Sequence, residues 1–166
     1  MKGCEKMYES YSRQALPDRK YREILGAALY VFNSNYDFLI ENILHIKDKL
    51  QLQDDIDWWD LMNLEAGKLK RKLQQDSFFE PYKEIFDHHP SLMHQFNHLK
   101  NRRNRIVHSF TATSDHDSHK QVLCSLDPKT KEQKEITEAD LLEFIKENEA
   151  FALQLDKFRN EILNKV

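Results

Sequence analysis

The chain has 166 residues, of which 40% are hydrophobic and 32% are charged, and its formal net charge is -3. A chain of this length can bury a core without disulfides or metal ions, and the composition is typical of a folded globular protein, not a disordered one. The negative charge argues against a nucleic-acid binder that is basic over its whole surface. A polyanion would have to bind a local basic patch.

The sequence carries no sign of export or of membrane insertion. The N-terminal segment MKGCEKMYESYSRQ has no apolar run that would suit a signal peptide, and no segment has the length of a membrane span. The two cysteines, Cys4 and Cys124, lie far apart and match no metal or redox spacing. We therefore expect a soluble, cytoplasmic protein that needs no cofactor and makes no contact with a membrane.

The distribution of turn-forming residues predicts long helices. Three glycines and four prolines are few for this length, which disfavours a fold rich in sheet. Residues 1–16 are expected to be a polar arm and residues 17–166 a single helical domain. Pro17 and Asp18 indicate a helix start, and apolar residues then recur every three or four positions over about 19–50.

A second helix is predicted at about 57–75, after the acidic segment QDDID, and a short helix near 78–86. The late part of the second helix, GKLKRKL, contains Lys68, Lys70 and Arg71. These cations have two interpretations. They form a solvated face near a helix C-terminus, or they provide a second contact for a polyanion.

The third main helix is predicted at about 90–110 and is followed by the polar loop TATSDHDSHK. Two short segments around DPKTK then predict a β-hairpin. Thr137 and Asp140 have the spacing of a capping box and would open a last helix that runs to about residue 164. The predicted fold class is all-α, a bundle of four to five helices with a small β-hairpin inserted before the last helix.

The third helix carries an arginine where its apolar stripe requires a core residue. The stripe steps by four, three, seven and four residues, and the missing position in its middle is Arg103; its members are Leu92, Phe96, Leu99, Ile106 and Phe110. A buried, unpaired guanidinium is costly. Arg103 must therefore extend to water, pair with a carboxylate or face an anion.

The surroundings of Arg103 favour an anion. No Asp or Glu occurs between Asp87 and Asp115, whereas an even spread of the chain's 28 acidic residues would place four or five there. The same window holds five of the eight histidines. Asn104 and His108 are four residues apart, so they share a helix face with Asn101. A basic patch without carboxylates is what a phosphate-binding surface requires.

These residues carry a resemblance to a known family. Residues 103–108 read R-N-x-x-x-H, late in a helix of a predicted all-α bundle, which resembles the signature of the HEPN family (higher eukaryotes and prokaryotes nucleotide-binding domains). The family pattern is an arginine, four to six residues and a histidine, most often with asparagine directly after the arginine. Arg102 also fits this spacing, so it is the alternative motif arginine.

The resemblance implies a metal-independent endoribonuclease that acts as a homodimer with a composite site. Arg103 would bind the phosphate, His108 would transfer the proton of the ribose 2′-hydroxyl, and Asn104 would orient His108 or the phosphate. A histidine imidazole titrates near neutral pH, which suits this role. The candidate RNA contacts are Lys100, Asn101, Arg102 and Arg105 on the third helix and Lys68, Lys70 and Arg71 on the second.

The resemblance also suggests a toxin or an anti-phage defence effector, with a cognate antitoxin or another regulatory partner. In toxins of this family that are paired with minimal nucleotidyltransferases, a tyrosine modified by the partner lies two places after the histidine. Here that residue is Phe110, which has no hydroxyl group. Neutralisation by adenylylation at this position is therefore not expected.

Two other interpretations remain open at this stage. The first is a non-catalytic HEPN-like helical dimer that binds RNA, a nucleotide or a protein partner, since folds often keep their shape and lose their chemistry. The second is a metal-dependent bundle hydrolase, suggested by DHHP and by His94 and His98 at a spacing of four. Metal sites in bundles usually include carboxylates, which this window lacks, so surface histidines are the preferred explanation.

Overall fold

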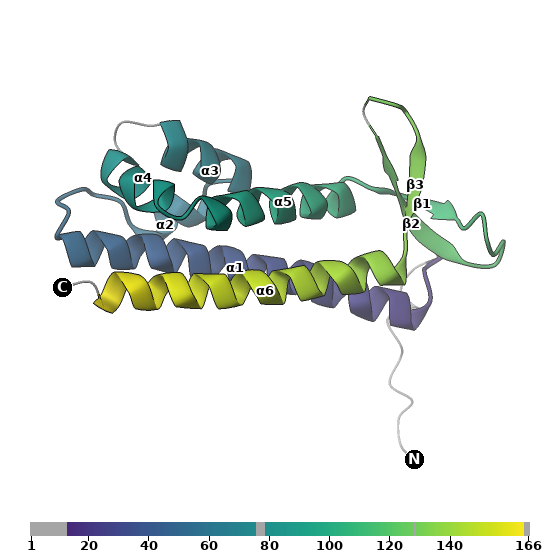
Figure 1. The fold of residues 1–166 in the computed structure, drawn as a ribbon. Helices are drawn as coiled ribbons and strands as arrows, with labels where there is room; N and C mark the ends of the chain where they lie inside the picture. The colour runs from purple at the N-terminus through teal and green to yellow at the C-terminus, as the bar shows by residue number, and fades with distance from the viewer. Residues whose placement is uncertain (1–12, 76–78, 128, 165–166) are drawn as a thin grey trace, which may run out of the picture.

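The computed structural model describes residues 13–75, 79–127 and 129–164, which form six helices and one small sheet (Figure 1). The helices are α1 (Arg19–Leu50), α2 (Trp58–Met62), α3 (Ala66–Gln75), α4 (Glu80–Asp87), α5 (Pro90–Val107) and α6 (Glu138–Asn164); the strands are β1 (Phe110–Thr113), β2 (Gln121–Leu126) and β3 (Gln133–Ile136). The described part of the chain is therefore mostly helical, as predicted. Most of the predicted N-terminal arm, residues 1–12, lies outside the described residues.

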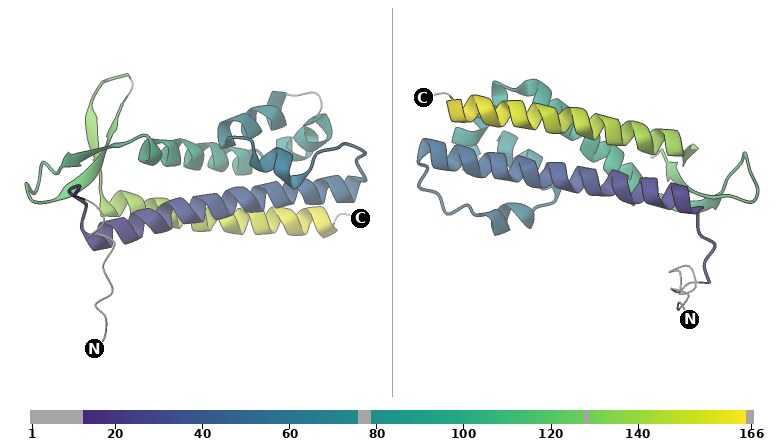
Figure 2. Two further views of the ribbon diagram at one scale, coloured as in Figure 1. Left: turned by 180° about the vertical axis from the view of Figure 1, so that it is seen from behind. Right: turned by 90° about the horizontal axis from the view of Figure 1, so that it is seen from below.

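The two longest helices, α1 and α6, lie side by side and run in the same direction (Figures 1 and 2). Buried amides join them. Asn35 Nδ2 donates to the carbonyl oxygen of Asn148 at 2.8 Å, and Asn42 Nδ2 donates to the carbonyl oxygen of Leu155 at 3.2 Å. Both pairs are separated by 113 residues. Because a buried amide is costly when it loses its partner, these bonds fix one register between the helices.

A single hydrophobic core lies between this pair and the remaining helices. Helix α5 runs along the pair in the opposite direction, α2, α3 and α4 cover one end, and the sheet covers the other (Figure 1). Each of the six described helices contributes buried apolar side chains to the core, including Phe32, Leu61, Leu69, Tyr82 and Phe96. No described helix combines the length and the apolar composition needed to cross a membrane.

Local side-chain bonds set the helix ends. Asp18 is the N-cap of α1 and accepts a hydrogen bond from the backbone N–H of Tyr21 at 2.9 Å. Thr137 and Asp140 bond reciprocally at the start of α6: the N–H of Asp140 donates to Thr137 Oγ1 at 3.1 Å, and the N–H of Thr137 donates to Asp140 Oδ2 at 2.9 Å. The predicted capping box is confirmed. The predicted bounds of α1 also agree with the structure.

Two predicted helices are wrong in part. The segment 57–75 is not one helix, because the chain turns at residues 63–65, where the carbonyl oxygen of Leu64 accepts a hydrogen bond from the Tyr36 hydroxyl at 2.7 Å. The predicted helix 90–110 ends at Val107, because the Ser109 hydroxyl donates to the carbonyl oxygen of Ile106 and the chain then becomes extended. The bundle thus has six described helices instead of four or five.

The predicted hairpin is confirmed but belongs to a larger sheet. The strand order is β1-β2-β3, and all pairs are antiparallel, with Phe110 opposite Cys124 and Leu123 opposite Ile136. Strand β1 was not predicted, because Phe110 seemed to continue the apolar stripe of the preceding helix. The Cys124 side chain is buried, and this burial raises the pKa of its thiol, which does not favour a nucleophilic role.

One tyrosine joins the sheet to α1. The Tyr21 hydroxyl donates to the carbonyl oxygen of Ile136 at 2.7 Å and accepts from the N–H of Leu123 at 3.2 Å. Its side chain is buried. A single hydroxyl therefore satisfies polar groups of two neighbouring strands at the point where they meet the bundle.

We predict that Tyr21→Phe lowers the free energy of unfolding by about 1–3 kcal/mol, because the buried carbonyl of Ile136 and the partly buried N–H of Leu123 lose their partner. Urea denaturation followed by circular dichroism measures this change. Tyr30→Phe is the matched control, since Tyr30 lies on the same helix and is 75% exposed. Equal stability of the two variants would contradict the assigned role of Tyr21.

Candidate functional site

Neighbouring arginines on α5 enter different surroundings. Successive residues of an α-helix are about 100° apart, so Arg102 and Arg103 cannot share one face. Arg102 lies toward α6, and Arg103 lies toward α1. Arg105 is exposed on the outer side of the helix.

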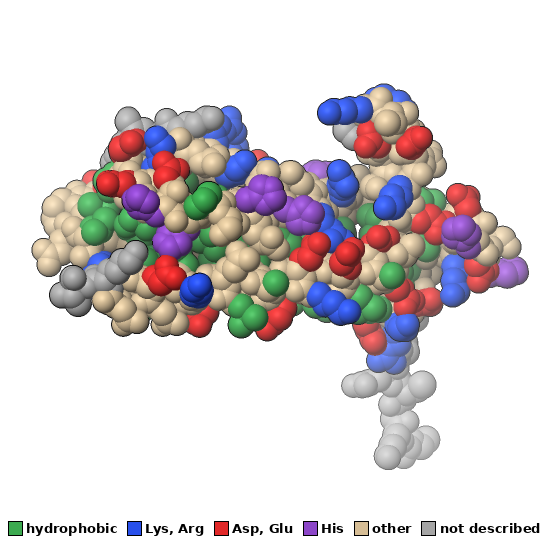
Figure 3. All heavy atoms as spheres, viewed as in Figure 1, with side chains coloured by type: hydrophobic (Ala, Val, Ile, Leu, Met, Phe, Trp, Pro, Cys, Tyr) green, Lys and Arg blue, Asp and Glu red, His purple; other side chains and the backbone are tan. Residues whose placement is uncertain are grey.

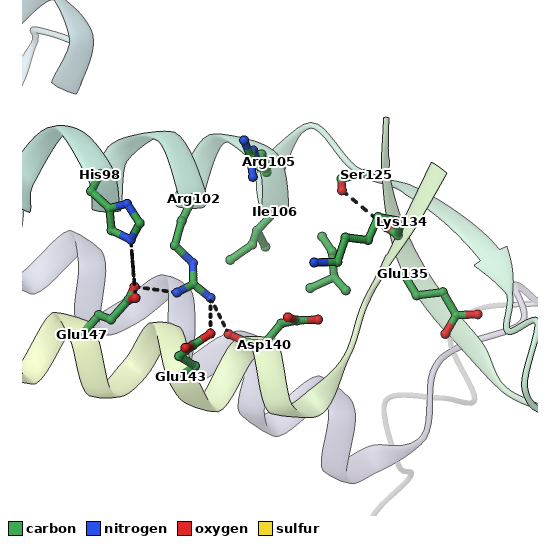
Figure 4. A pocket seen from close by; sticks show the side chains of 11 residues that line it. His98, Arg102, Arg105, Ile106, Ser125, Lys134, Glu135, Asp140, Glu143 and Glu147 are labelled. Atoms are coloured by element: carbon green, nitrogen blue, oxygen red, sulfur yellow. Dashed lines mark hydrogen bonds and ion pairs between the residues drawn. The ribbon is translucent and has the colours of Figure 1, made fainter. Parts of the chain in front are cut away.

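Arg102 is bound to the acidic side of α6. Its Nη1 donates to Glu147 Oε2 at 2.6 Å, and its Nη2 donates to the carbonyl oxygen of Asp140 at 2.9 Å and lies 3.4 Å from Glu143 Oε2 (Figure 4). The side chain is 20% exposed. A guanidinium with these partners is already neutralised and held in place. The contacts of Arg102 thus belong to the packing of α5 on α6.

Arg103 has no carboxylate partner among the described residues. Its Nη1 donates to Asn104 Oδ1 at 3.1 Å, and its guanidinium carbon lies 5.6 Å from the centre of the Phe32 ring. The side chain thus leaves the apolar stripe over an aromatic ring, a favourable setting for a cation. It lines a cavity of about 550 Å³ between α1 and the turn that joins α2 to α3. The Arg103 guanidinium is therefore available to an anion.

His108 lies at the C-terminal end of α5 and is exposed. Its backbone N–H donates to the carbonyl oxygen of Asn104 at 2.9 Å, and its imidazole has no partner within the described part of the chain. Among the described residues that line the cavity at Arg103, His108 is not present. Asn104 orients Arg103 through its side chain, so the expected link from the Asn104 side chain to His108 is not seen within one copy of the chain.

The cations predicted on the second helix lie next to those on α5. Burial lowers the pKa of Lys100, and the nearby charge of Lys70 on α3 lowers it further. Arg71 is exposed, and Lys68 lies 3.6 Å from Glu65 one turn earlier in a solvent-exposed pair. The structure thus brings Lys70 and Lys100 together from separate helices, where a polyanion would relieve their repulsion.

The outer face of α5 is polar and basic. His94, His98, Asn101, Arg105 and His108 are all exposed and follow one another at steps of four and three residues. In Figure 3 a row of histidine, lysine and arginine side chains follows α5, and acidic side chains gather over α6 beneath it. The predicted site residues Asn101, Arg105 and His108 therefore share one surface.

A cleft of about 380 Å³ separates α5 from α6 and the sheet (Figure 4). Most of its acids have partners: Glu147 with His98 at 3.3 Å and with Arg102, Glu135 with Ser114 and the N–H of Asp115, and Asp140 with Thr137. Burial would raise the pKa of Asp140, but the hydrogen bonds from Thr137 and the charges of Lys134 and Arg102 outweigh it and hold the pKa below its ordinary value.

Two cations of this cleft, Arg105 and Lys134, have no ion pair within the described residues. Sequence reasoning missed Lys134, which lies on β3 between Gln133 and Glu135. Its local pattern resembles any solvated strand, and only the packing of the sheet against α5 places it near Arg105. The two side chains add positive charge close to the end of α5, where His108 lies.

A metal site has no support in the described part of the chain, where no three His, Cys, Asp or Glu side chains are grouped so that they could hold an ion. His98 instead contacts Glu147.

We also compared the chain with protein-family models, curated proteins and solved structures, and none of them matches it.

The two arginines should differ in their effect on stability. We predict that Arg102→Ala lowers the free energy of unfolding by about 1–3 kcal/mol, because Glu147 and the carbonyl oxygen of Asp140 lose a partly buried donor. Arg103→Ala should cost below about 1 kcal/mol, since it removes mainly a cation–π contact. Thermal and urea unfolding of both variants measure the difference, and the reverse order would overturn this assignment.

Proposed function

We propose that the protein is a metal-independent endoribonuclease of HEPN type that acts as a homodimer in the cytoplasm, with Arg103 and His108 as its catalytic residues. The observation that carries this proposal is the setting of Arg103. Arg103 interrupts the apolar stripe of α5 and has no carboxylate partner among the described residues. Its guanidinium donates a hydrogen bond to Asn104, and the exposed His108 lies five residues after it. Since Arg102 is bound to α6, we assign the motif arginine to Arg103.

The chemistry follows from the residue types. The His108 imidazole takes the proton of a ribose 2′-hydroxyl, whose oxygen then attacks the adjacent phosphorus. The bond from phosphorus to the 5′-oxygen breaks, and this oxygen leaves with the proton that His108 has taken up, which returns the imidazole to its neutral form. Arg103 opposes the negative charge that grows on the phosphoryl oxygens. The products are a 2′,3′-cyclic phosphate and a 5′-hydroxyl, and no metal ion is needed.

The separation of Arg103 and His108 within one chain favours a site built from two copies of the chain. Five helical residues separate Arg103 from His108, which is about 140° around the axis, and no described cavity is lined by both. Val107 and Phe110, on either side of His108, are 47% and 41% exposed. Apolar side chains exposed next to a functional residue suit a contact with a second copy. That copy would bring its own arginine to this histidine.

The surrounding cations provide the RNA-binding surface in this proposal. Arg105 and Lys134 line the cleft between α5 and the sheet, Lys70 and Lys100 lie close together on α3 and α5, and Arg71 is exposed on α3. Neutralising several phosphates releases counterions, so binding would weaken steeply with salt. Cleavage of cellular RNA by such an enzyme fits a toxin or an anti-phage effector, and an antitoxin or other regulator would then hold it inactive.

The purified protein should cleave RNA in the presence of EDTA and leave 2′,3′-cyclic phosphate ends. His108→Ala should reduce the cleavage rate at least about 100-fold, because general acid–base catalysis is lost. His94→Ala is the matched control, since His94 is also exposed on the outer face of α5. RNA binding retained without cleavage in either the wild type or the variant would favour the alternative of a HEPN-like module that only binds.

Mixing two inactive variants tests the composite site. A heterodimer of Arg103→Ala and His108→Ala subunits has one site with both residues intact if each site takes its arginine and its histidine from different subunits. Random subunit exchange should then restore about a quarter of the wild-type activity. A mixture as inactive as its components would place both residues of each site in the same subunit and contradict the composite arrangement.

A further inference from the structure

The cavity beside Arg103 is lined by aromatic, acidic and basic side chains. Its floor contains the aromatic rings of Phe32 and Tyr36, which are fixed by packing on Phe144 and Phe96 at ring-centre distances of 6.3 and 6.2 Å. The Tyr36 hydroxyl is bound to the carbonyl oxygen of Leu64 and so holds the α2–α3 turn against α1. The volume of about 550 Å³ lies within the range of about 300–1,000 Å³ that is usual for small-ligand sites.

One carboxylate of this cavity is unusual. Asp37 is half-buried and has neither a hydrogen bond nor an ion pair within the described residues. Burial raises its pKa, and the charge of Glu41 raises it further. The other acid of the cavity, Glu65, is exposed and lies 3.6 Å from Lys68. A half-buried carboxylate without a donor is costly, and a ligand with N–H groups would supply what it lacks.

Charged side chains from two helices line the cavity. Asp37 lies one helical turn after Asn33 on α1, and Arg103 enters from α5. The charges of Asp37 and Arg103 both act on Tyr36. Burial and the charge of Asp37 raise the pKa of the Tyr36 hydroxyl to about 12, while the charge of Arg103 opposes this rise. The tyrosine thus lies within electrostatic reach of the cation and of the carboxylate. Asn33 and Asn63, which also line the cavity, are exposed.

We propose that this cavity binds one nucleotide of the RNA substrate and selects guanine, with Arg103 on the phosphate and Asp37 on the base. This inference rests on the proposed ribonuclease function and names its base specificity. Guanine is the only standard base whose Watson–Crick edge presents two adjacent N–H donors, N1–H and N2–H. An ionised carboxylate only accepts hydrogen bonds and can bind both. Asn33 and Asn63 can donate amide N–H groups to O6 and N7.

The other bases fit this acceptor less well. Adenine and cytosine place an acceptor nitrogen beside their amino group, and uracil flanks its single N–H with two carbonyls. Each of these arrangements sets a lone pair against the second oxygen of Asp37. Arg103, which contacts the phosphate in this proposal, supports binding without selecting among bases.

Isothermal titration of the full chain with 5′-GMP and 5′-AMP tests the proposal without a need for catalysis. The wild type should bind 5′-GMP at least about tenfold more tightly than 5′-AMP, because one charge-assisted hydrogen bond distinguishes them. Asp37→Asn should abolish this preference, with Asp37→Ala as a second variant and circular dichroism as a check of folding. Asp48→Asn, an exposed aspartate on the same helix, should keep it.

Mapping of the RNA ends formed by wild type and Asp37→Asn completes the test. The wild type should cut next to guanine, and Asp37→Asn should cut with this preference lost. Equal affinity for the two nucleotides, no saturable binding of either, or an unchanged preference in Asp37→Asn would overturn the guanine site, even if RNA is cleaved. Selective 5′-GMP binding by a protein that never cleaves RNA would leave the site standing and remove the ribonuclease proposal.

Discussion

The arrangement of the candidate site depends on the register between α1 and α6. Asn35 and Asn42 are buried on α1, and their amides reach backbone carbonyls of α6 at a constant separation of 113 residues. Arg159 adds a bond from α6 back to Asn42 Oδ1 at 2.7 Å. A shift of either helix would leave these polar groups without partners in the core. Everything that packs on this pair is positioned by it.

The register between α1 and α6 decides which residues the arginines of α5 contact. Helix α5 lies against both members of the pair, so one arginine meets the acids of α6 and the next meets the aromatic ring of Phe32 on α1. The first becomes part of the packing, and the second keeps a guanidinium that faces a cavity. Two adjacent residues of one type thereby differ in the chemistry open to them, although their sequence neighbours are nearly the same.

Sequence reasoning reached the parts of the fold that local chemistry decides. The apolar period of α1 and the capping box of Thr137 and Asp140 are local, so the bounds of α1 and the start of α6 agree with their predictions. The turn at Leu64 was missed because its cause, the Tyr36 hydroxyl, is 28 residues away. Strand β1 was missed because Phe110 fits the stripe of α5 and pairs only with a later strand.

The candidate site was predictable to a similar extent. The carboxylate-free window and the misplaced Arg103 were visible in the sequence, and the structure gives that arginine no acidic partner among the described residues. The partners of Arg102 could not be foreseen, because Asp140 and Glu147 lie some 40 residues later and become neighbours only when α6 packs on α5. Lys134 and Asp37 could not be identified either, because only tertiary packing places them in a cleft with Arg105 and in a cavity with Arg103.

The pairing of the first long helix with the last has a consequence for synthesis on the ribosome. Chains grow at about 5–20 residues per second, so α1 waits on the order of ten seconds before its partner positions on α6 are made. Until then the apolar face of α1, which includes Phe32 and Leu39, is not covered by α6 and can bind a chaperone. Arg102 also lacks its acids during this interval. Any activity that needs α5 in place therefore begins only after the last helix has emerged.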